Sequence, residues 1–139
     1  MKLCLSIVLF SLYLSSMHGQ NVVFDKKLDF KIVYSEKGIT DQSSDKDTTQ
    51  CKQWNISQSV IPSIIKNSKV INGNQWHDDF GVFPCIVAGQ LEQKGQLYNF
   101  EINAGSWMYI FCRGKTLILG CYKKEYEKYF IGNARDPKE

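Results

Sequence analysis

The most regular hydrophobic pattern in the chain lies between residues 82 and 121, where four apolar segments are separated by short polar ones that contain glycine. Apolar runs of this length, joined by glycine-containing turns, are typical of consecutive antiparallel strands. The pattern therefore predicts a four-stranded β-meander made of VFPCIVAGQL, LYNFEIN, WMYIFC and TLILGC.

The expected turns then predict which strand residues lie opposite one another, because each residue added to a turn shifts the register. A two-residue turn is expected at Lys94-Gly95, a four-residue turn at 103–106, and a turn centred on Gly114. The predicted neighbours across the strands are Leu91 with Tyr98, Val87 with Ile102, Ile102 with Trp107, Phe100 with Tyr109, Tyr98 with Phe111, Phe111 with Leu117, Tyr109 with Leu119, and Trp107 with Cys121.

These registers place an uncharged set of side chains on one face of the sheet. A slip of one residue in any hairpin would move side chains to the opposite face, so the uncharged face supports the registers. The other face mixes Asn99 and Glu101 with Met108 and Ile110, and we expect another element to cover part of it. The predicted apolar face consists of Phe83, Cys85, Val87, Leu91, Tyr98, Phe100, Ile102, Trp107, Tyr109, Phe111, Leu117, Leu119 and Cys121.

The flanking segments predict one more strand and two short helices. Residues Leu28–Tyr34 alternate as a strand does, and Ser35–Gln50 is a polar loop. Helical spacing predicts a short helix from about Ser59 to Ser68, followed by a turn at Asn72-Gly73. Residues Tyr122–Phe130 read as a short amphipathic C-terminal helix. The fold class is therefore α+β, with a curled antiparallel β-meander of four to five strands between two short helices.

The N-terminal residues 1–19 have the pattern of a secretory signal peptide. Lys2 precedes the apolar run Leu3–Leu14, which is too short to span a bilayer, and small residues follow it. Cleavage is expected after Gly19 or after Ser16. Residues 20–139 then form a single exported domain, secreted or periplasmic, with no later segment that could span a membrane.

The four cysteines beyond the signal peptide predict two disulfides, because an even number in an exported chain favours pairing. A zinc site needs paired short spacings, which these cysteines lack. The predicted register places Cys112 and Cys121 on opposite faces, about 15 Å apart, too far to bond. We therefore expect Cys85–Cys121 together with Cys51–Cys112, which requires the sheet to curl.

The charge of the chain argues against nucleic acid as a partner. Seventeen basic and 14 acidic residues give a net charge of +3, and removing Lys2 leaves +2. A charge this small, without a stripe of lysine or arginine, is unlike the electrostatic footprint of a nucleic-acid-binding protein. No cofactor is indicated by the sequence either.

Catalytic chemistry is best sought in the segment QWHDDFGVFPC, residues 75–85. His77 would act as a general base, with Asp78 beside it and Asp79 or Glu101 orienting the ring. A nucleophile is not apparent, because the cysteines are expected to be oxidised and there is no G-x-S-x-G motif. One histidine and two carboxylates are also too few for a metal site. The alternative interpretation, a solvated loop that leads into the first meander strand, is favoured.

Between Gln75 and Phe130 the chain resembles small exported bacterial proteins, of the kind found in Bacteroidetes, that have no assigned activity. The similarity rests on the motifs WHDDFGVFPC, AGQL, YNFEINAGS and ILGC. It implies a secreted or periplasmic setting and assigns no catalytic residue.

The sequence therefore predicts a non-enzymatic exported binding protein with another protein as its partner, similar in role to an inhibitor or an immunity protein. The exposed loops Ser35–Gln50 and Gln75–Gly81 are the expected binding surfaces. The alternatives are a small secreted hydrolase that uses His77 with Asp78 or Asp79, and a structural protein of the cell envelope.

Overall fold

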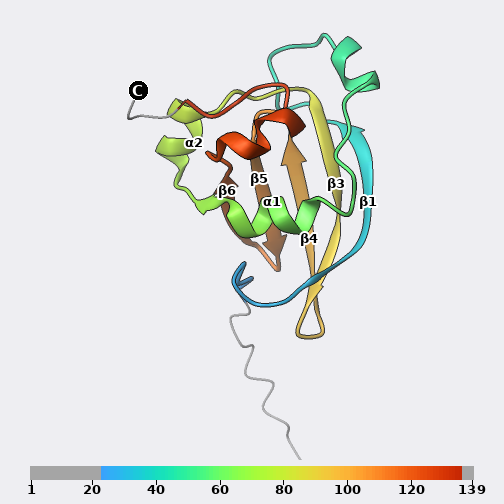
Figure 1. The fold of residues 1–139 in the computed structure, drawn as a ribbon, viewed down its shortest axis with the longest axis vertical. Helices are drawn as coiled ribbons and strands as arrows, with labels where there is room; N and C mark the ends of the chain where they lie inside the picture. The colour runs from blue at the N-terminus through green and yellow to red at the C-terminus, as the bar shows by residue number, and fades with distance from the viewer. Residues whose placement is uncertain (1–22, 136–139) are drawn as a thin grey trace, which may run out of the picture.

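Six strands form one antiparallel sheet in the computed structural model, which describes residues 23–135. The strand order is β1-β3-β4-β5-β6-β2, so that β3 to β6 are neighbours in both sequence and space, as the predicted meander requires (Figure 1). The strands are β1 (Lys31–Ile39), β2 (Lys69–Val70), β3 (Cys85–Gln93), β4 (Gln96–Asn103), β5 (Trp107–Cys112) and β6 (Lys115–Gly120). The segment predicted as a signal peptide lies outside the described residues.

The first hairpin of the meander has the predicted register. Lys94 and Gly95 both adopt positive φ, 50° and 76°, which closes a two-residue turn that matches the twist of the strands. Leu91 consequently lies opposite Tyr98. This part of the prediction is confirmed because the Lys94-Gly95 turn is tight and its glycine is visible in the sequence.

The other two predicted registers are wrong by one residue. Between β4 and β5 the loop has three residues rather than four, because Ser106 adopts a φ of 73° and donates its backbone N–H to the carbonyl of Asn103. Between β5 and β6 the turn has two residues, with Arg113 at a φ of 50° before Gly114. The observed neighbours are Asn103 with Trp107, Ile102 with Met108, Phe100 with Ile110, Ile110 with Leu117, and Met108 with Leu119.

The two slips have opposite effects on the faces of the sheet. The first turns β5 over, so that Met108 and Ile110 are buried where Trp107 and Tyr109 were expected. The second returns β6 to the predicted orientation, with Leu119 buried. We call the face that carries Phe100 and Leu119 the core face, and the face that carries Glu101 and Trp107 the outer face. The buried side chains of the central cluster are Phe24, Ile56, Ile61, Ile64, Ile65, Val87, Leu91, Tyr98, Phe100, Ile102, Met108, Ile110 and Leu119.

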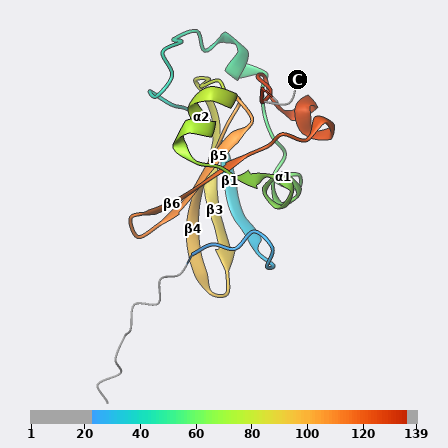
Figure 2. The ribbon, with the colours of Figure 1, turned by 90° about the vertical axis from the view of Figure 1, so that its left-hand side faces the viewer.

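Helices cover the core face and one end of the outer face. Helix α1 (Ile61–Asn67) confirms the predicted helix and buries its three isoleucines against the core face, with Pro62 near its start as expected. The 3₁₀ helix η2 (Lys124–Tyr129) lies where the amphipathic C-terminal helix was predicted and packs against the same core. Helix α2 (Gly73–Asp79) lies on the other side of the sheet from α1 (Figure 2). None of the helices between residues 23 and 135 has the length and apolar character needed to cross a membrane.

The polar loop predicted at Ser35–Gln50 begins later in the structure. Residues 35–39 extend β1, which pairs with β3 as far as Cys85. A β-bulge lies between Ile32 and Tyr34. Here the strand passes very close to Gly89: a Cβ atom on residue 89 would lie 2.1 Å from the carbonyl oxygen of Tyr34. Edge strands tolerate polar side chains, because their backbone pairing does not require a buried face. Polarity alone was therefore a poor guide to the end of β1.

The predicted disulfide pairing is wrong, since the structure contains a single disulfide, Cys51–Cys85, among the described residues. Cys51 belongs to the 3₁₀ helix η1 (Thr49–Lys52), which is the next element along the chain after β1, and the last residue of β1 pairs with Cys85. The two Cα atoms lie 5.1 Å apart. Cys112 and Cys121 are free thiols, and burial raises the pKa of Cys121. The topology of β1, rather than the meander register, determines the partner of Cys85.

Candidate functional site

The segment that carries the catalytic candidates is helical rather than a loop. Asn72 was expected in a turn, but it caps α2: its side chain accepts a hydrogen bond from the backbone N–H of Gln75, and the Gln75 side chain accepts one from the backbone N–H of Asn72. This reciprocal arrangement is a capping box, a signal for a helix start that the sequence contains. Helix α2 therefore fixes the directions of His77, Asp78 and Asp79.

His77 and Asp78 form a pair on the solvent side of α2. The Nδ1 atom of His77 lies 2.9 Å from Oδ1 of Asp78, and the two side chains are 81% and 72% exposed. An exposed pair between chain neighbours contributes little to stability. It also offers a substrate no enclosed position between a base and a second reactive group.

Asp79 is directed away from that pair. Its carboxylate accepts a hydrogen bond of 2.5 Å from the Tyr122 hydroxyl, and its backbone carbonyl accepts one from the N–H of Arg135. Asp79 thus attaches the C-terminal segment to α2. The structure does not bring His77, Asp78 and Asp79 to a common point. Within residues 23–135 there is also no group of three His, Cys, Asp or Glu side chains suited to a metal ion.

The side of α2 that faces the sheet begins a series of aromatic contacts. The ring of Trp76 packs edge to face on Trp107, with centroids 5.4 Å apart, and Trp107 packs in the same way on Tyr109 at 4.9 Å. Trp107 is fully buried and donates its indole N–H to the carbonyl of Gly81 at 2.9 Å. We call Trp76, Trp107 and Tyr109 the aromatic row. It leads from α2 across β5 on the outer face.

Glu101 lies beside the far end of the aromatic row, directly opposite Tyr109 in the β4–β5 ladder. Burial raises the pKa of its carboxyl group above the ordinary value. Burial also raises the pKa of Tyr109, and the negative charge of Glu101 adds to that effect. The Glu101 carboxylate is thus held against aromatic surface in partly desolvated surroundings.

Two buried polar atoms on this face have no hydrogen-bond partner among the described residues. They are Oε1 of Glu101, an acceptor, and Nε1 of Trp76, a donor. Buried polar groups are nearly always paired, and leaving one unpaired costs about 1–3 kcal/mol. On the outer face, these two unpaired polar atoms therefore raise the free energy of the folded state, and no hydrogen bond within the described residues compensates for them.

Beyond Glu101, the outer face presents exposed apolar side chains. Tyr34, Leu97 and Phe111 are 45%, 46% and 39% exposed. The ladders connect Tyr34 through β3 and β4 to Phe111, so these two lie on the same face as Glu101. Across four strands they span about 14 Å. We call the surface formed by Trp76, Tyr109, Glu101, Tyr34, Leu97 and Phe111 the outer-face patch.

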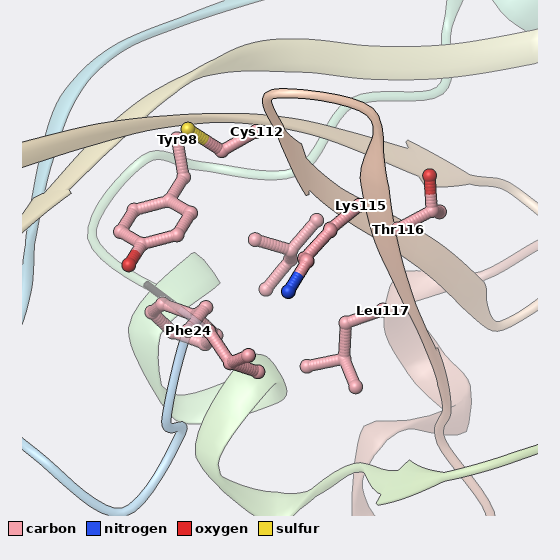
Figure 3. A pocket seen from close by; sticks show the side chains of 8 residues that line it. Phe24, Tyr98, Cys112, Lys115, Thr116 and Leu117 are labelled. Atoms are coloured by element: carbon pink, nitrogen blue, oxygen red, sulfur yellow. The ribbon is translucent and has the colours of Figure 1, made fainter. Parts of the chain in front are cut away.

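A cavity of about 320 Å³ lies on the core side of the sheet, at the end opposite the disulfide. Its walls come from the segment before β1 and from β4, β5 and β6 (Figure 3). The residues that line it are Val23, Phe24, Tyr98, Ile110, Cys112, Lys115, Thr116 and Leu117. It is separate from the outer-face patch, because the sheet lies between them.

No protein-family model, curated protein or solved structure matches the chain. The resemblance to small exported bacterial proteins consequently stays a prediction, and the site is judged from its own geometry.

Only part of the outer-face patch could be predicted from the sequence. Glu101 was expected, as an alternative to Asp79, to orient His77, whereas the structure places it next to Tyr109. The predicted register put Phe111 and Tyr109 in the core, because nothing in the sequence marks Ser106 as a residue with positive φ. The mixed polarity of the other face was the one signal that pointed to this surface.

Proposed function

We propose that the protein is an exported, non-enzymatic binding protein whose outer-face patch holds a partner protein through a lysine or arginine side chain. The observation that carries this proposal is Glu101, a partly buried carboxylate with one oxygen that accepts no hydrogen bond from the described residues. A cationic group from a partner would supply both the missing hydrogen bond and the opposite charge.

Export is supported by the disulfide Cys51–Cys85, since such bonds persist in oxidising compartments outside the cytosol. The predicted signal peptide at residues 1–19 points to the same setting. An inhibitor or immunity protein works in this setting by occupying the surface of another protein, and the patch suits that mode of action.

A cation is the favoured ligand group because the charges and the rings on this face agree. Glu36 lies in the same ladder row as Glu101, with Ala88 between them, so two carboxylates share this part of the face. The nearby Lys31 is already paired with Glu92 at 3.5 Å. The ring of Tyr109 adds an aromatic surface of the kind that attracts ammonium and guanidinium groups, with about 0.5–2 kcal/mol per contact.

A protein is the favoured kind of partner because the patch is wide and apolar at its edge. Tyr34 and Phe111 lie on different strands at the two sides of the patch, with β3 and β4 between them. Interfaces typically combine exposed aromatic side chains with a few desolvated polar groups near the centre. Glu101 holds that central place here.

The hydrolase alternative has less support, because Asp79 bonds to Tyr122 and the exposed pair of His77 and Asp78 faces solvent. A structural protein of the cell envelope would have no defined soluble partner. A cross-linked adduct with one partner protein would therefore distinguish a binding protein from it.

Site-specific photo-cross-linking tests the proposal. A photoreactive phenylalanine analogue replaces Phe111 in the patch or, as a matched control, Leu28, which lies before β1 and is also 39% exposed. Each protein is incubated with the exported fraction of the source organism and irradiated. We expect a defined adduct from position 111 only, with the link near a lysine or arginine of the partner.

The substitution Glu101→Gln then tests the role of the carboxylate. We expect adduct formation to need about tenfold more partner, since a charge-assisted hydrogen bond contributes about 1.5–3 kcal/mol. Equal labelling from position 28, or an adduct at 111 that is insensitive to Glu101→Gln, would contradict the proposal.

A further inference from the structure

The cavity on the core side of the sheet has the size of a small-molecule site. Its volume is about 320 Å³, which corresponds to roughly ten water molecules in the liquid. Voids of this size are few in protein interiors, and small-molecule sites begin at about 300 Å³. Phe24, Ile110 and Leu117 give this space apolar walls (Figure 3). Such walls favour contact with hydrocarbon over contact with water.

The hydroxyl group of Tyr98 is a buried polar group in this lining, and it has no partner. Tyr98 is only 3% exposed, and its ring packs edge to face on Phe24, with centroids 5.5 Å apart. No hydrogen bond of the described residues includes the Tyr98 hydroxyl, although buried hydroxyl groups nearly always have a partner. Burial raises the pKa of Tyr98, so the hydroxyl keeps its proton and remains a donor.

The small surface that Tyr98 still exposes belongs to the cavity. The fully buried polar atoms without a partner are Nε1 of Trp76 and Oε1 of Glu101, so the Tyr98 oxygen is not sealed inside the protein. Tyr98 lines the cavity, and its oxygen lies at the end of the ring beside Phe24 (Figure 3). A ligand in the cavity therefore reaches this hydroxyl if it carries a hydrogen-bond acceptor.

The charges around the cavity favour a neutral ligand. None of the described residues that line it is acidic. Lys115 has an exposed side chain with an interaction of its own, so it places no desolvated charge among the apolar walls. A charged group would have to leave water without gaining a buried counter-charge, which is costly. A carbonyl oxygen needs only the single donor that Tyr98 provides.

We infer that the cavity binds an uncharged, largely apolar molecule that carries a carbonyl oxygen. The hydrocarbon part lies between Phe24, Ile110 and Leu117, and the oxygen accepts a hydrogen bond from Tyr98. The inference does not depend on the proposed function, because the sheet separates the cavity from the outer-face patch. It adds a small-molecule ligand to a protein whose outer face suggests a protein partner.

The thiol of Cys112 can report whether the cavity is occupied. Cys112 lines the cavity and is partly exposed, and Nε2 of Gln96 donates a hydrogen bond of 3.3 Å to its Sγ. The other free thiol, Cys121, is buried and does not line the cavity. A bound ligand shields Cys112 from a maleimide reagent. The rate of modification at Cys112 therefore measures occupancy.

Butyrophenone and butylbenzene form a matched pair of probes, because a carbonyl group in the first replaces a methylene group in the second. Isothermal titration calorimetry measures their affinities for the purified protein below their solubility limits. Mass spectrometry measures the rate at which the maleimide modifies Cys112. We expect both probes to bind and to slow this modification several-fold. The anion 4-phenylbutanoate is expected to bind more weakly than butyrophenone.

Variants assign the binding to the cavity and to the hydroxyl. Tyr98→Phe is expected to weaken butyrophenone binding about threefold to tenfold, as the loss of one hydrogen bond should, and to leave butylbenzene unchanged. Its melting temperature should not fall, because the hydroxyl has no partner in the unliganded protein. Tyr34→Phe, at an exposed tyrosine on the outer face, should change neither affinity. Leu117→Phe, at a partly exposed position, should fill the cavity and weaken both probes.

Three results would each overturn the inference: neither probe binds, butyrophenone binds the wild type and Tyr98→Phe equally well, or bound probe leaves Cys112 as reactive as before. Tighter binding of 4-phenylbutanoate than of butyrophenone would also overturn it, because the site would then select an anion. A melting temperature within a few degrees of the wild type shows that a variant is folded. Should Leu117→Phe fail this check, the comparison of Tyr98→Phe with Tyr34→Phe still decides the question.

Discussion

The two faces of the sheet are built from the same strands and serve different purposes. The core face carries Phe100, Ile102 and Met108 beneath α1 and η2, and its central side chains are almost inaccessible to solvent. The outer face is covered around Trp107 by α2 and by the residues that follow it, and it carries Glu101 and exposed aromatic side chains. The apolar burial that stabilises the fold is therefore concentrated on the core face, whereas the buried polar atoms without a hydrogen-bond partner lie on the outer face.

This difference shows why burial alone does not identify a site in this fold. Trp107 on the outer face is as buried as Phe100 on the core face. What distinguishes the outer face is Glu101, which is desolvated without being paired. A group that raises the free energy of the folded state and serves no internal contact indicates where an external contact is expected.

The largest effect should come from truncating the core face. Phe100→Ala is expected to lower the free energy of unfolding by about 3–5 kcal/mol, because it leaves a cavity among the helices and the sheet. Phe111→Ala, the matched phenylalanine on the outer face, should cost less than about 1 kcal/mol, since the side chain is 39% exposed. Urea denaturation monitored by circular dichroism measures both. Similar losses for the two variants would show that the faces are not distinct.

The next largest effect concerns the disulfide, which fastens η1 to the core-face side of β3. Replacing Cys51 and Cys85 together by alanine should lower stability by about 2–4 kcal/mol, whereas Cys112→Ala should have a small effect. Peptide mapping without reduction should recover the Cys51–Cys85 pair. A recovered Cys85–Cys121 pair would restore the pairing expected from the sequence and refute the structure at this end of the sheet.

The contrast between the faces also explains how far the sequence could lead. Apolar segments and the Lys94-Gly95 turn were enough to predict the meander and its first register, because glycine marks a positive φ. Arg113-Gly114 forms the same kind of turn as Lys94-Gly95, and its register was missed because a longer turn centred on Gly114 was expected, whereas Ser106 adopts positive φ without a glycine at that position to mark it. Because the shifts cancel at β6, only β5 was assigned to the wrong face.

The candidate site was harder to predict than the fold for the same reason. Which of the β5 aromatics face outward depends on a single residue in the loop before them, and the outer-face patch contains two of them, Tyr109 and Phe111. The disulfide was mispredicted because it depends on where β1 ends, at Ile39 beside Cys85. Short-range patterns do not contain that long-range pairing.

A smaller effect is expected from Glu101→Gln, and its sign is opposite to that of the core variants. Burial raises the pKa of Glu101 in the folded state above its unfolded value, so folding favours the protonated form. The protonated carboxyl group of Glu101 therefore contributes to the free energy of unfolding at low pH. That contribution is lost as the pH rises through the pKa that Glu101 has in the folded protein. Glutamine removes that loss and should stabilise the protein at neutral pH by less than about 1 kcal/mol, since the side chain is only partly buried and solvent screens part of the effect.

Chemical denaturation of wild type and Glu101→Gln across the acidic range measures this difference. The gap between the two proteins should open as pH rises and then remain constant. A Glu101→Gln variant that is less stable at neutral pH would mean that the carboxylate has an internal partner, and the outer-face patch would lose its central feature.

The smallest effect is expected from His77→Ala, which sharpens the comparison within α2 itself. The His77 side chain is exposed on the solvent side of this helix and lies within hydrogen-bond distance of Asp78, whereas Trp76 on the sheet side packs against Trp107. His77→Ala should change stability by less than about 0.5 kcal/mol and leave the adduct at position 111 unchanged. Trp76→Ala should lower stability measurably and reduce adduct formation, because it removes the ring that ends the aromatic row. If the purified protein instead had a hydrolytic activity that His77→Ala abolished, the solvent side of α2 would carry the reactive group. The binding proposal would then be wrong, and the hydrolase alternative would be supported.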